Sequence, residues 1–401
     1  MKGRILPLIL TLLLLTGCAA GPAALEPAQS VPPVEARADA ALDAALGDFG
    51  LELLRQTRQE GENTFLSPLS VLLCLSMTAN GAAGETLSQF EDLLGGELDA
   101  LNANAASLLA DYEDELDMAG SLWLDGRAQV EDPFVGRCAD TYGAEVFAAD
   151  FTGDATRRDI NAWIEKHTGG HIKDAVAALK PETMLAIVNA LYFEGEWAET
   201  FRPEQTEQDY PFHPADGSEA AVAMMNSGGR TERYLSGGGA EGVLLPYKDS
   251  RLAFLALLPP EGTGLGDWLE ELDSAALSEL MDGAEERYLV LRLPKFEAMW
   301  KRSLVEPLKA MGLTDAFDPG LADLSAMGTG PDGAPLYLSA VEHGAGIQVD
   351  EQGTKAYAFT IAAPGAGASS VQVVSFQRPF LYGIVDLERG IPLFLGTFEA
   401  P

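Results

Sequence analysis

The sequence predicts one folded domain of the α+β class. Segments with helical periodicity dominate the first half of the chain and strand-like segments dominate the second. The two kinds do not alternate strictly, unlike those of a parallel α/β sheet. The 401 residues have an ordinary globular composition, 47% hydrophobic and 22% charged, and no break in composition divides them. A single domain of this length lies near the upper limit of what one core supports.

Helices are expected where apolar residues recur every three to four positions. The clearest start is at Ser67, a good N-cap residue followed by Pro68 at the first helical position, and Asn80-Gly81 ends that helix. The expected helices are residues 38–59, 69–79, 85–94, 98–113, 133–142, 155–166, 266–272, 275–281 and 303–311.

The strongest strand signal is the nearly continuous apolar run from Thr183 to Phe193. It predicts a strand buried on both faces at the centre of a sheet, where Asn189 needs a hydrogen-bond partner. A short strand is expected just before Ser67. Further strands are expected at residues 120–124, 243–246, 252–258, 288–293, 336–347, 371–376, 380–385 and 392–398.

The stretch from Val349 to Pro379 differs from an ordinary strand. On a strand its small residues share one face, namely Thr354, Ala356, Ala358 and Thr360, while Tyr357 and Phe359 face the other way. Residues 362–370 contain a proline, two glycines and no core-forming residue, so they should be an exposed loop. The small face suits insertion between existing strands. An ordinary strand followed by a surface loop is the simpler reading of these residues alone.

The formal net charge is −35, which argues against binding of nucleic acid or anionic lipid through the folded body. An acidic, solvated surface that favours solubility is the simpler interpretation. Two cysteines lie in apolar helical contexts, Cys74 and Cys138, and we expect unpaired core thiols there.

The N-terminus has the pattern of a processing signal. Lys2 and Arg4 precede an apolar segment, residues 5–15, that is too short to span a bilayer. The segment closes with Leu15-Thr16-Gly17-Cys18, which resembles the lipobox of bacterial lipoproteins. An ordinary secretory signal with an incidental cysteine is the alternative.

The lipobox resemblance implies a signal peptide at residues 1–17 and a lipid on Cys18, with a Pro- and Ala-rich flexible tether through residue 37. Cleavage removes Lys2 and Arg4 and no acid, which leaves 24 basic against 61 acidic residues, a net charge of −37. The membrane anchor must therefore be the lipid. The expected location is a bacterial cell membrane, facing the outside.

From about Ala38 to Pro401 the chain resembles the serpin family. Each motif is weak alone, but their order and spacing together are specific. The motifs are Phe65-Leu66-Ser67-Pro68-Leu69-Ser70, Gly81-Ala82 with Thr86 and Gln89, Ile160-Asn161 with Trp163, Val188-Asn189-Ala190-Leu191-Tyr192-Phe193 with Gly195 and Trp197, Leu245-Pro246-Tyr247, Leu293-Pro294-Lys295-Phe296, Ala322-Asp323-Leu324-Ser325, Ser339 with His343, Glu351 with Gly353-Thr354, Arg378-Pro379-Phe380 and Pro392-Leu393-Phe394-Leu395-Gly396.

The resemblance implies a fold of three β-sheets and eight or nine helices, with a reactive-centre loop at about residues 351–375. It implies a monomeric suicide inhibitor of serine proteases, not an enzyme, that needs no cofactor or metal. The protease cleaves the loop and forms an acyl-enzyme, and the hinge then inserts into the main sheet as a new strand. The implied hinge residues are Glu351, Gly353, Thr354, Ala356 and Ala358.

Counting from the family's landmarks locates the cleaved bond. Sixteen steps from Glu351 and twelve steps back from Pro379 both reach Gly367, so the bond is Gly367–Ala368, with the neighbouring bonds at Ala366 and Ser369 as alternatives. A tiny side chain before the bond suits elastase-like or subtilisin-like enzymes.

Three residues depart from the small-residue run of inhibitory serpins: Lys355, Tyr357 and Phe359. They leave open a non-inhibitory protein that is cleaved as a substrate or acts as a binding module.

The resemblance also assigns residues that control opening of the main sheet. Ser67, Ser70, Asn189 and His343 match positions that hold the sheet closed, and Trp197, Lys295 and Glu351 match the place where insertion begins, with an expected Lys295–Glu351 ion pair. A catalytic arrangement of His343 with Ser67 and an aspartate is the alternative, and the lack of a nucleophile-elbow motif argues against it. Gly169-Gly170 breaks the helix that a metal pair of His167 and His171 would need.

Overall fold

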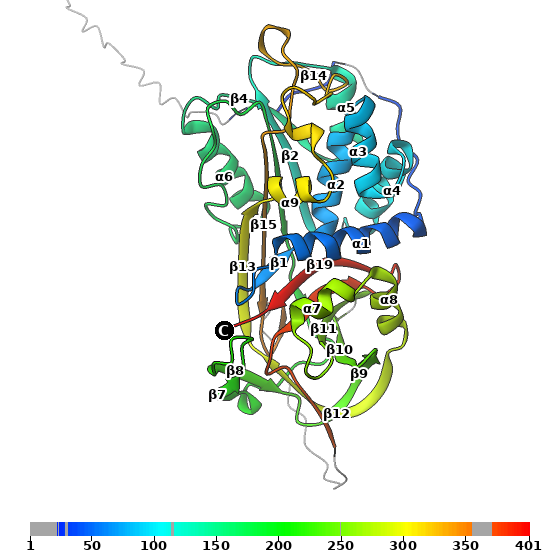
Figure 1. Ribbon diagram of the computed structural model, residues 1–401, viewed down its shortest axis with the longest axis vertical. Helices are drawn as coiled ribbons and strands as arrows, with labels where there is room; N and C mark the ends of the chain where they lie inside the picture. Colours follow the sequence, from blue (N-terminus) through cyan, green and yellow to red (C-terminus); the bar gives the residue numbers. More distant parts are fainter. Residues whose placement is uncertain (1–21, 23, 29–30, 114–115, 249, 355–370) are drawn as a thin grey trace, which may run out of the picture.

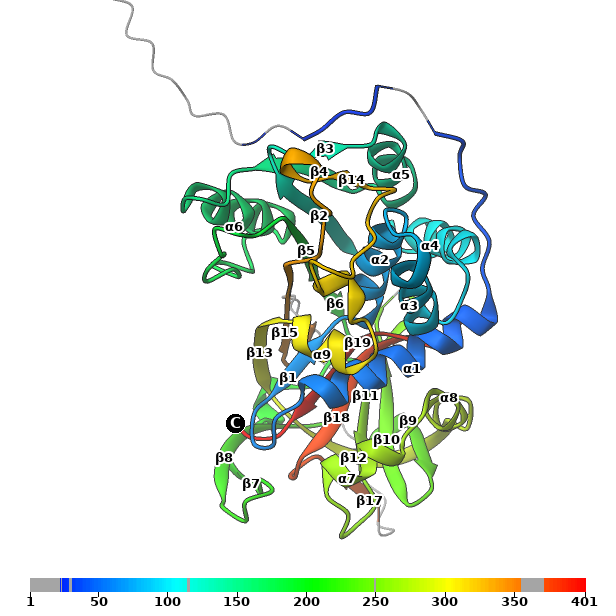
Figure 2. The same cartoon turned by 45° about the horizontal axis from the view of Figure 1, so that its top comes forward.

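The computed structural model describes residues 22, 24–28, 31–113, 116–248, 250–354 and 371–401. A tall five-stranded sheet forms one part of the molecule, with most helices beside it, and a ten-stranded sheet forms the other (Figure 1). Helix α1 (Ala40–Thr57) crosses the junction between the two parts (Figures 1 and 2).

The described residues form nine α-helices, and each lies where the sequence predicts a helix. After α1 they are α2 (Pro68–Ala79), α3 (Gly84–Leu94), α4 (Leu98–Tyr112), α5 (Asp132–Tyr142), α6 (Ala155–His167), α7 (Leu265–Glu271), α8 (Ser274–Asp282) and α9 (Val305–Ala310). The cap predicted at Ser67 is present, because its side chain accepts a hydrogen bond from the Ser70 amide at 3.2 Å. Every residue of α2 is buried, so this helix forms the middle of the core.

The five-stranded sheet has the order β13 (Phe296–Ser303), β15 (Ala340–Val349), β5 (Leu185–Tyr192), β2 (Asp117–Asp125) and β4 (Glu145–Ala149). The predicted central strand is therefore confirmed as β5. Strands β15 and β5 pair in parallel from Ala340 opposite Ala186 to Gly346 opposite Tyr192, so they are direct neighbours with no strand between them.

The ten-stranded sheet consists mainly of strands from the C-terminal half, and several of its neighbouring strands are far apart in the sequence. Its order is β1 (Thr64–Leu66), β19 (Ile391–Phe398), β18 (Phe380–Asp386), β11 (Leu252–Leu258), β10 (Ala240–Pro246), β9 (Arg230–Gly237), β12 (Glu285–Pro294), β8 (Ala220–Asn226) and β7 (Glu207–Phe212), with β17 (Gln372–Ser375) on β12. β12 pairs with β9 through its first half and with β8 through its end, so one long strand joins two groups of strands into a continuous sheet.

Two short ladders complete the described strands. β14 (Gly328–Thr329) pairs with β3 (Gln129–Val130), and β16 (Gly353–Thr354) pairs with β6 (Gly195–Glu196). The short 3-10 helices are Pro203–Gln205, Asp315–Phe317 and Pro331–Gly333.

The sequence did not predict several of the observed strands. Strand β13 alternates buried Phe296, Ala298 and Trp300 with exposed neighbours, which is the pattern of a half-buried edge strand. It extends to Ser303, so the helix predicted at residues 303–311 begins later, at Val305. Strands β4, β7, β8 and β9 were also not predicted, because their apolar signal is short or interrupted.

The strand expected from Val349 onwards is interrupted in the structure. β15 ends at Val349, the chain turns at Asp350, and strand geometry returns only at β16, the last two described residues before the loop. The turn is closed by the Asp350 amide, which donates to the Gly353 carbonyl at 3.0 Å. The remaining positions of the small-residue face, and Cys18, lie outside the described residues.

Described parts of the expected N-terminal tether contact the body. Ala24 forms an antiparallel bridge with Phe147 on β4, and the Leu25 amide donates to the Val146 carbonyl at 2.6 Å. Further along, the Arg37 amide donates to the Ala103 carbonyl at 2.9 Å.

Two further findings concern the cysteines and the membrane. The expectation for the cysteines is confirmed, since Cys74 and Cys138 are both free and buried. Among the described helices, none has the length and apolar character needed to cross a bilayer.

Candidate functional site: the sheet-closing cluster and the hinge

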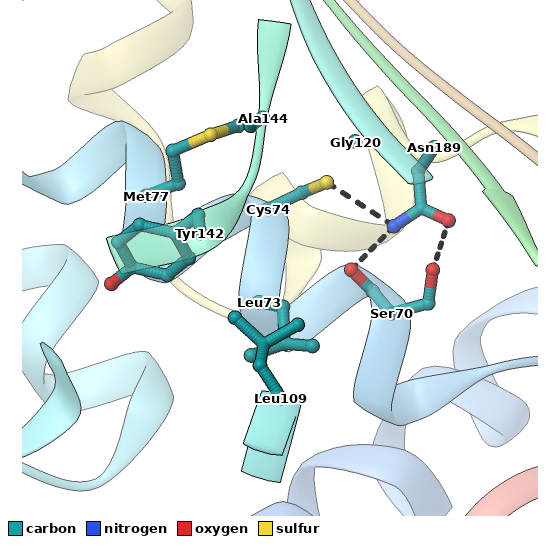
Figure 3. A pocket seen from close by; sticks show the side chains of 9 residues that line it. All are labelled: Ser70, Leu73, Cys74, Met77, Leu109, Gly120, Tyr142, Ala144 and Asn189. Carbon is teal, nitrogen blue, oxygen red and sulfur yellow. Dashed lines mark hydrogen bonds between the residues drawn. The ribbon is translucent and has the colours of Figure 1, made fainter. Parts of the chain in front are cut away.

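Ser67, Ser70, Asn189 and His343, here called the sheet-closing cluster, lie together where the N-terminus of α2 meets β5 and β15. The Ser70 hydroxyl donates to Asn189 Oδ1, and Asn189 Nδ2 donates to the Ser70 carbonyl and to Cys74 Sγ, the latter at 3.2 Å (Figure 3). Asn189 is thus satisfied, as a buried polar group must be. These bonds tie β5 to α2.

His343 ties β15 to the same helix end. Its Nε2 accepts a hydrogen bond from the Ser67 amide at 3.0 Å, and the Ser67 hydroxyl donates to the Leu393 carbonyl of β19 at 2.8 Å. His343 and Asn189 are register partners on β15 and β5. One helix start therefore holds both strands of the parallel pair, and β19 as well.

The environment of His343 keeps its imidazole neutral. The residue is 2% exposed, and burial lowers the pKa of His343 to about 3. Its Nδ1 has no hydrogen-bond partner among the described residues. Protonation at Nε2 would break the bond from the Ser67 amide, because that nitrogen could no longer accept.

The geometry does not favour the catalytic alternative for Ser67 and His343. His343 accepts from the backbone amide of Ser67, whereas the Ser67 hydroxyl donates to a carbonyl. A nucleophile activated by a base would have its hydroxyl bonded to the imidazole. The described residues contain no group of His, Cys, Asp and Glu that could hold a metal, and His167 Nδ1 lies 2.8 Å from the Trp163 carbonyl.

A cavity of about 30 Å³ adjoins the sheet-closing cluster, between α2, α4 and β2 (Figure 3). Leu73, Met77, Leu109 and Tyr142 line its apolar side, and Ser70, Cys74 and Asn189 line the other. It has room for about one or two water molecules.

The second part of the site is the start of the hinge, at the end of β15. The expected ion pair is present, with Lys295 Nζ 2.7 Å from Glu351 Oε2. Thr206 donates to Glu351 Oε1 at 2.8 Å. Burial alone would raise the pKa of Glu351, but the hydrogen bonds from Lys295 and Thr206 outweigh it and hold this pKa below its usual value.

Trp197 fixes the turn that leads from β15 into the hinge. Its indole Nε1 donates to the Asp350 carbonyl at 2.9 Å, and its backbone amide donates to the Gln352 carbonyl at 3.0 Å. The indole stacks on Tyr247, with ring centroids 5.0 Å apart. Trp197 therefore holds the turn through two of its backbone carbonyls, and Tyr247 supports the indole.

The last described hinge residues are already buried, in a slot beside β6. Gly353 has φ of 153°, and a Cβ there would lie 2.2 Å from the Gly195 carbonyl oxygen, so only glycine fits. Thr354 is 1% exposed, and its hydroxyl lies 2.7 Å from the Tyr247 hydroxyl. Burial raises the pKa of Tyr247, so this contact is between two neutral hydroxyls.

The far end of the loop is fixed as well. β17 pairs in parallel with β12, and Val374 and Phe376 are buried. Arg378 Nη2 donates to the Pro259 carbonyl at 2.6 Å. The segment between Thr354 and β17, which includes Ala356, Ala358 and the expected bond at Gly367–Ala368, lies outside the described residues between these two anchors.

Sequence reasoning missed three contributors to the site. Tyr247 and Gly195 stood among the family motifs without a role, and the structure places both against the hinge. Thr206 carried no signal in the sequence, because nothing local marks its contact with Glu351.

Comparison with known proteins identifies the class. A model of the family described as "Serpin (serine protease inhibitor)" matches residues 44–401. The chain is 30% identical over 385 residues to the leukocyte elastase inhibitor of Xenopus tropicalis, a match that covers 90% of this chain and 99% of the relative. The chain belongs to the serpin family.

Solved structures agree with the family assignment. The thermophilic serpin tengpin in its native state is 31% identical, with a TM-score of 0.88 over 95% of this chain and 100% of tengpin. Against the latent state of tengpin the identity is 30% and the TM-score 0.79, over 91% and 99%. The arrangement seen here is thus nearer the native state. Human thyroxine-binding globulin, 24% identical with a TM-score of 0.80 over 90% and 98%, shows the fold alone.

The fold prediction is confirmed at the level of the family and class. Where three sheets were expected, the described residues form two large sheets, one of five and one of ten strands, and two short two-stranded ladders, because β12 joins two groups of strands into one continuous sheet. The nine described helices fall within the expected number.

Proposed function

We propose that this protein is a suicide-type inhibitor of serine endopeptidases that works by insertion of its cleaved loop into the five-stranded sheet. The observation that carries the proposal is the parallel pair of β15 and β5 next to a hinge that leaves the end of β15. A strand that turns back after β15 runs antiparallel to β15, and hence also to β5. Insertion would replace one parallel contact by two antiparallel ones, which pair slightly better per residue.

The sheet-closing cluster fits the control of such a step. Asn189 of β5 and His343 of β15 are both bonded to the start of α2, so the two strands can separate only if at least one of these anchors moves or breaks. The cluster would therefore resist opening of the gap until the hinge inserts. The small residues Thr354, Ala356 and Ala358 would then enter the packed interior, where larger side chains are costly.

The target class follows from the expected bond. Gly367 or its neighbours Ala366 and Ala368 offer only a tiny side chain to the primary pocket, so we propose elastase-like or subtilisin-like targets.

We also propose that Cys18 carries a lipid and holds the inhibitor on the outside of a bacterial cell membrane, with no nucleic-acid partner and no cofactor. The lipobox pattern at residues 15–18 supports this location.

A second candidate is a serpin that is cleaved without trapping its protease, or that binds a ligand. Lys355, Tyr357 and Phe359 favour it, because bulky side chains near the hinge could slow insertion until the acyl-enzyme hydrolyses. The solved fold of thyroxine-binding globulin also belongs to a protein named for binding a hormone.

One experiment separates the two candidates. Residues 19–401 are incubated with an elastase-like and a subtilisin-like protease and run on a denaturing gel, and the released C-terminal peptide is weighed by mass spectrometry. A boiling-resistant band at the summed mass, with a peptide starting at Ala368, would support inhibition. Cleavage without that band would favour the substrate reading.

A matched pair of variants tests the insertion itself. Ala358→Arg puts a long charged side chain on the face expected to enter the sheet, so it should turn the inhibitor into a substrate. Phe359→Arg puts the same side chain on the opposite face and should keep the complex. Equal yields of complex from both variants would contradict the period-two assignment.

A further inference from the structure

Two exposed apolar side chains lie next to each other where the chain re-enters the body after the loop. Among the described residues four large hydrophobic side chains are more than 40% exposed: Tyr288, Met299, Leu321 and Val373. Tyr288 is 56% exposed and Val373 is 49% exposed, and they sit on the neighbouring strands β12 and β17. Figure 2 shows these two strands together at the bottom of the view, far from α5 and α6.

The register puts these side chains on one face of the sheet. Val373 is opposite Val290, and Gln372 is opposite Leu289, so Tyr288 comes one position earlier, beside Val371. Partners in a parallel pair point the same way, and side chains alternate along each strand. Tyr288, Val290 and Val373 therefore share the outer face, while Leu289, Leu291 and Val374 are buried beneath. We call these three outer residues the loop-exit patch.

The neighbouring hairpin leaves the loop-exit patch open. Gly228 and Gly229 have φ of 69° and 84°, and a Cβ on Gly229 would lie 2.9 Å from the Tyr288 hydroxyl. Glycine there gives the tyrosine ring space without covering it. Next to the ring on β9, Thr231 is opposite Tyr288, and Arg233 is opposite Glu286, which balances the local charge. The patch is thus apolar at its centre and polar at its edge, as docking surfaces are.

The expected cleaved bond, Gly367–Ala368, is so close in sequence to the loop-exit patch that a protease bound at this bond would lie over the patch. Gly367 precedes Val373 by six residues, which span at most about 20 Å. A protease domain of about 225 residues has a radius of gyration near 17 Å, or a diameter of roughly 45 Å. Its cleft also holds some of the residues after the bond, so little free chain is left before β17. The edge of the enzyme must then come close to the strand on which Val373 lies.

We propose that the loop-exit patch is a docking surface for the rim of the target protease's cleft, on the side that holds the residues after the cleaved bond. The inference rests on the proposed function only in that a protease engages the loop. The rim it fits is apolar, because Tyr288 and the two valines offer no charge. The net charge of −35 attracts an enzyme that is positively charged overall, through a longer-range field.

The test measures kcat/KM for cleavage of the loop in residues 19–401 by the elastase-like and subtilisin-like enzymes. Tyr288→Ala and Tyr288→Lys should each lower kcat/KM about tenfold, the effect of losing a central aromatic contact. Tyr288→Phe should keep most of the rate, and Val373→Ser should lower it by a smaller factor. The matched control is Leu321→Ala, which truncates another exposed side chain, 61% exposed, away from the loop, and should change nothing.

The dependence of the cleavage rate on ionic strength distinguishes direct apolar contact from long-range electrostatic attraction. Raising the ionic strength should slow cleavage of all variants alike, while the ratio between wild type and Tyr288→Ala should stay, because an apolar contact is not screened. Thermal unfolding of each variant checks that the fold is kept. If Tyr288→Ala alone unfolds early, Tyr288→Lys and Val373→Ser still carry the test.

The outcomes distinguish this inference from the proposed function. Boiling-resistant complex formed at the same rate by wild type, Tyr288→Lys and Val373→Ser would overturn the docking surface and keep the inhibitor. Cleavage that is slowed by Tyr288→Lys but never yields a complex would keep the docking surface and overturn the inhibitor. If neither protease cuts the loop at all, both are overturned.

Discussion

Acidification should destabilise this protein through His343 in a way that can be calculated from its environment. The neutral imidazole is buried, and its pKa is lowered from 6.5 to about 3. Between pH 6.5 and about pH 3, His343 therefore binds a proton in the unfolded chain and stays neutral in the folded chain. The stability due to the neutral imidazole is fully present above pH 6.5 and is lost as the pH falls from 6.5 towards 3.

The size of the effect follows from linkage. At pH 5, which is 1.5 units below the ordinary pKa of 6.5, the histidine is protonated in the unfolded chain and neutral in the folded one. This difference lowers the free energy of unfolding by about 2 kcal/mol relative to pH 7. In the folded state the Ser67 amide donates to Nε2 at 3.0 Å, and protonation of that nitrogen would break this hydrogen bond. Protonation of His343 in the folded state is therefore unfavourable.

The assay compares urea unfolding at pH 7 and pH 5 for wild type, His343→Gln and His213→Gln. The variant at His343 should lack about 2 kcal/mol of the acid-induced loss, whereas replacement of the exposed His213 should leave it unchanged. An equal pH dependence in wild type and His343→Gln would refute the reasoning. Lower stability of His343→Gln at both pH values would not, because the difference between the two pH values is the measured quantity.

Three further predictions concern the hinge and the core. Lys295→Met should weaken the hinge anchor by about 1 kcal/mol, a small value because the Lys295 side chain is 42% exposed. On native gels after heating, the native form of this variant should disappear several-fold faster than that of the wild type, and an unchanged rate would contradict this prediction. Gly353→Ala should push β16 off β6 and lower the free energy of unfolding, measured in urea, by roughly 1–3 kcal/mol, whereas Gly153→Ala, with open space around it, should be neutral. Burial raises the pKa of Cys74 to about 12, so a thiol reagent at pH 8 should label it only after unfolding; rapid labelling of the folded chain would mean that α2 opens.

Local patterns determined much of the architecture of this chain. Ser67 and Pro68 mark the start of α2, and the apolar run around Asn189 marks a strand buried on both faces, because capping and alternation report the burial of a segment without naming its partner. The family motifs then supplied the roles of residues such as Lys295 and Glu351, whose contact is present in the structure.

Partnership between distant segments was decided only by the tertiary structure. Ser70 meets Asn189 and Ser67 meets His343 across 119 and 276 positions, and Thr354 meets Tyr247 across 107. Strand β13 was missed because an edge strand shows only half of its residues to the core, and Thr206 because a contact with Glu351 leaves no local trace. Periodicity encodes which face of a segment is buried, whereas the packing of the whole chain sets what it is buried against.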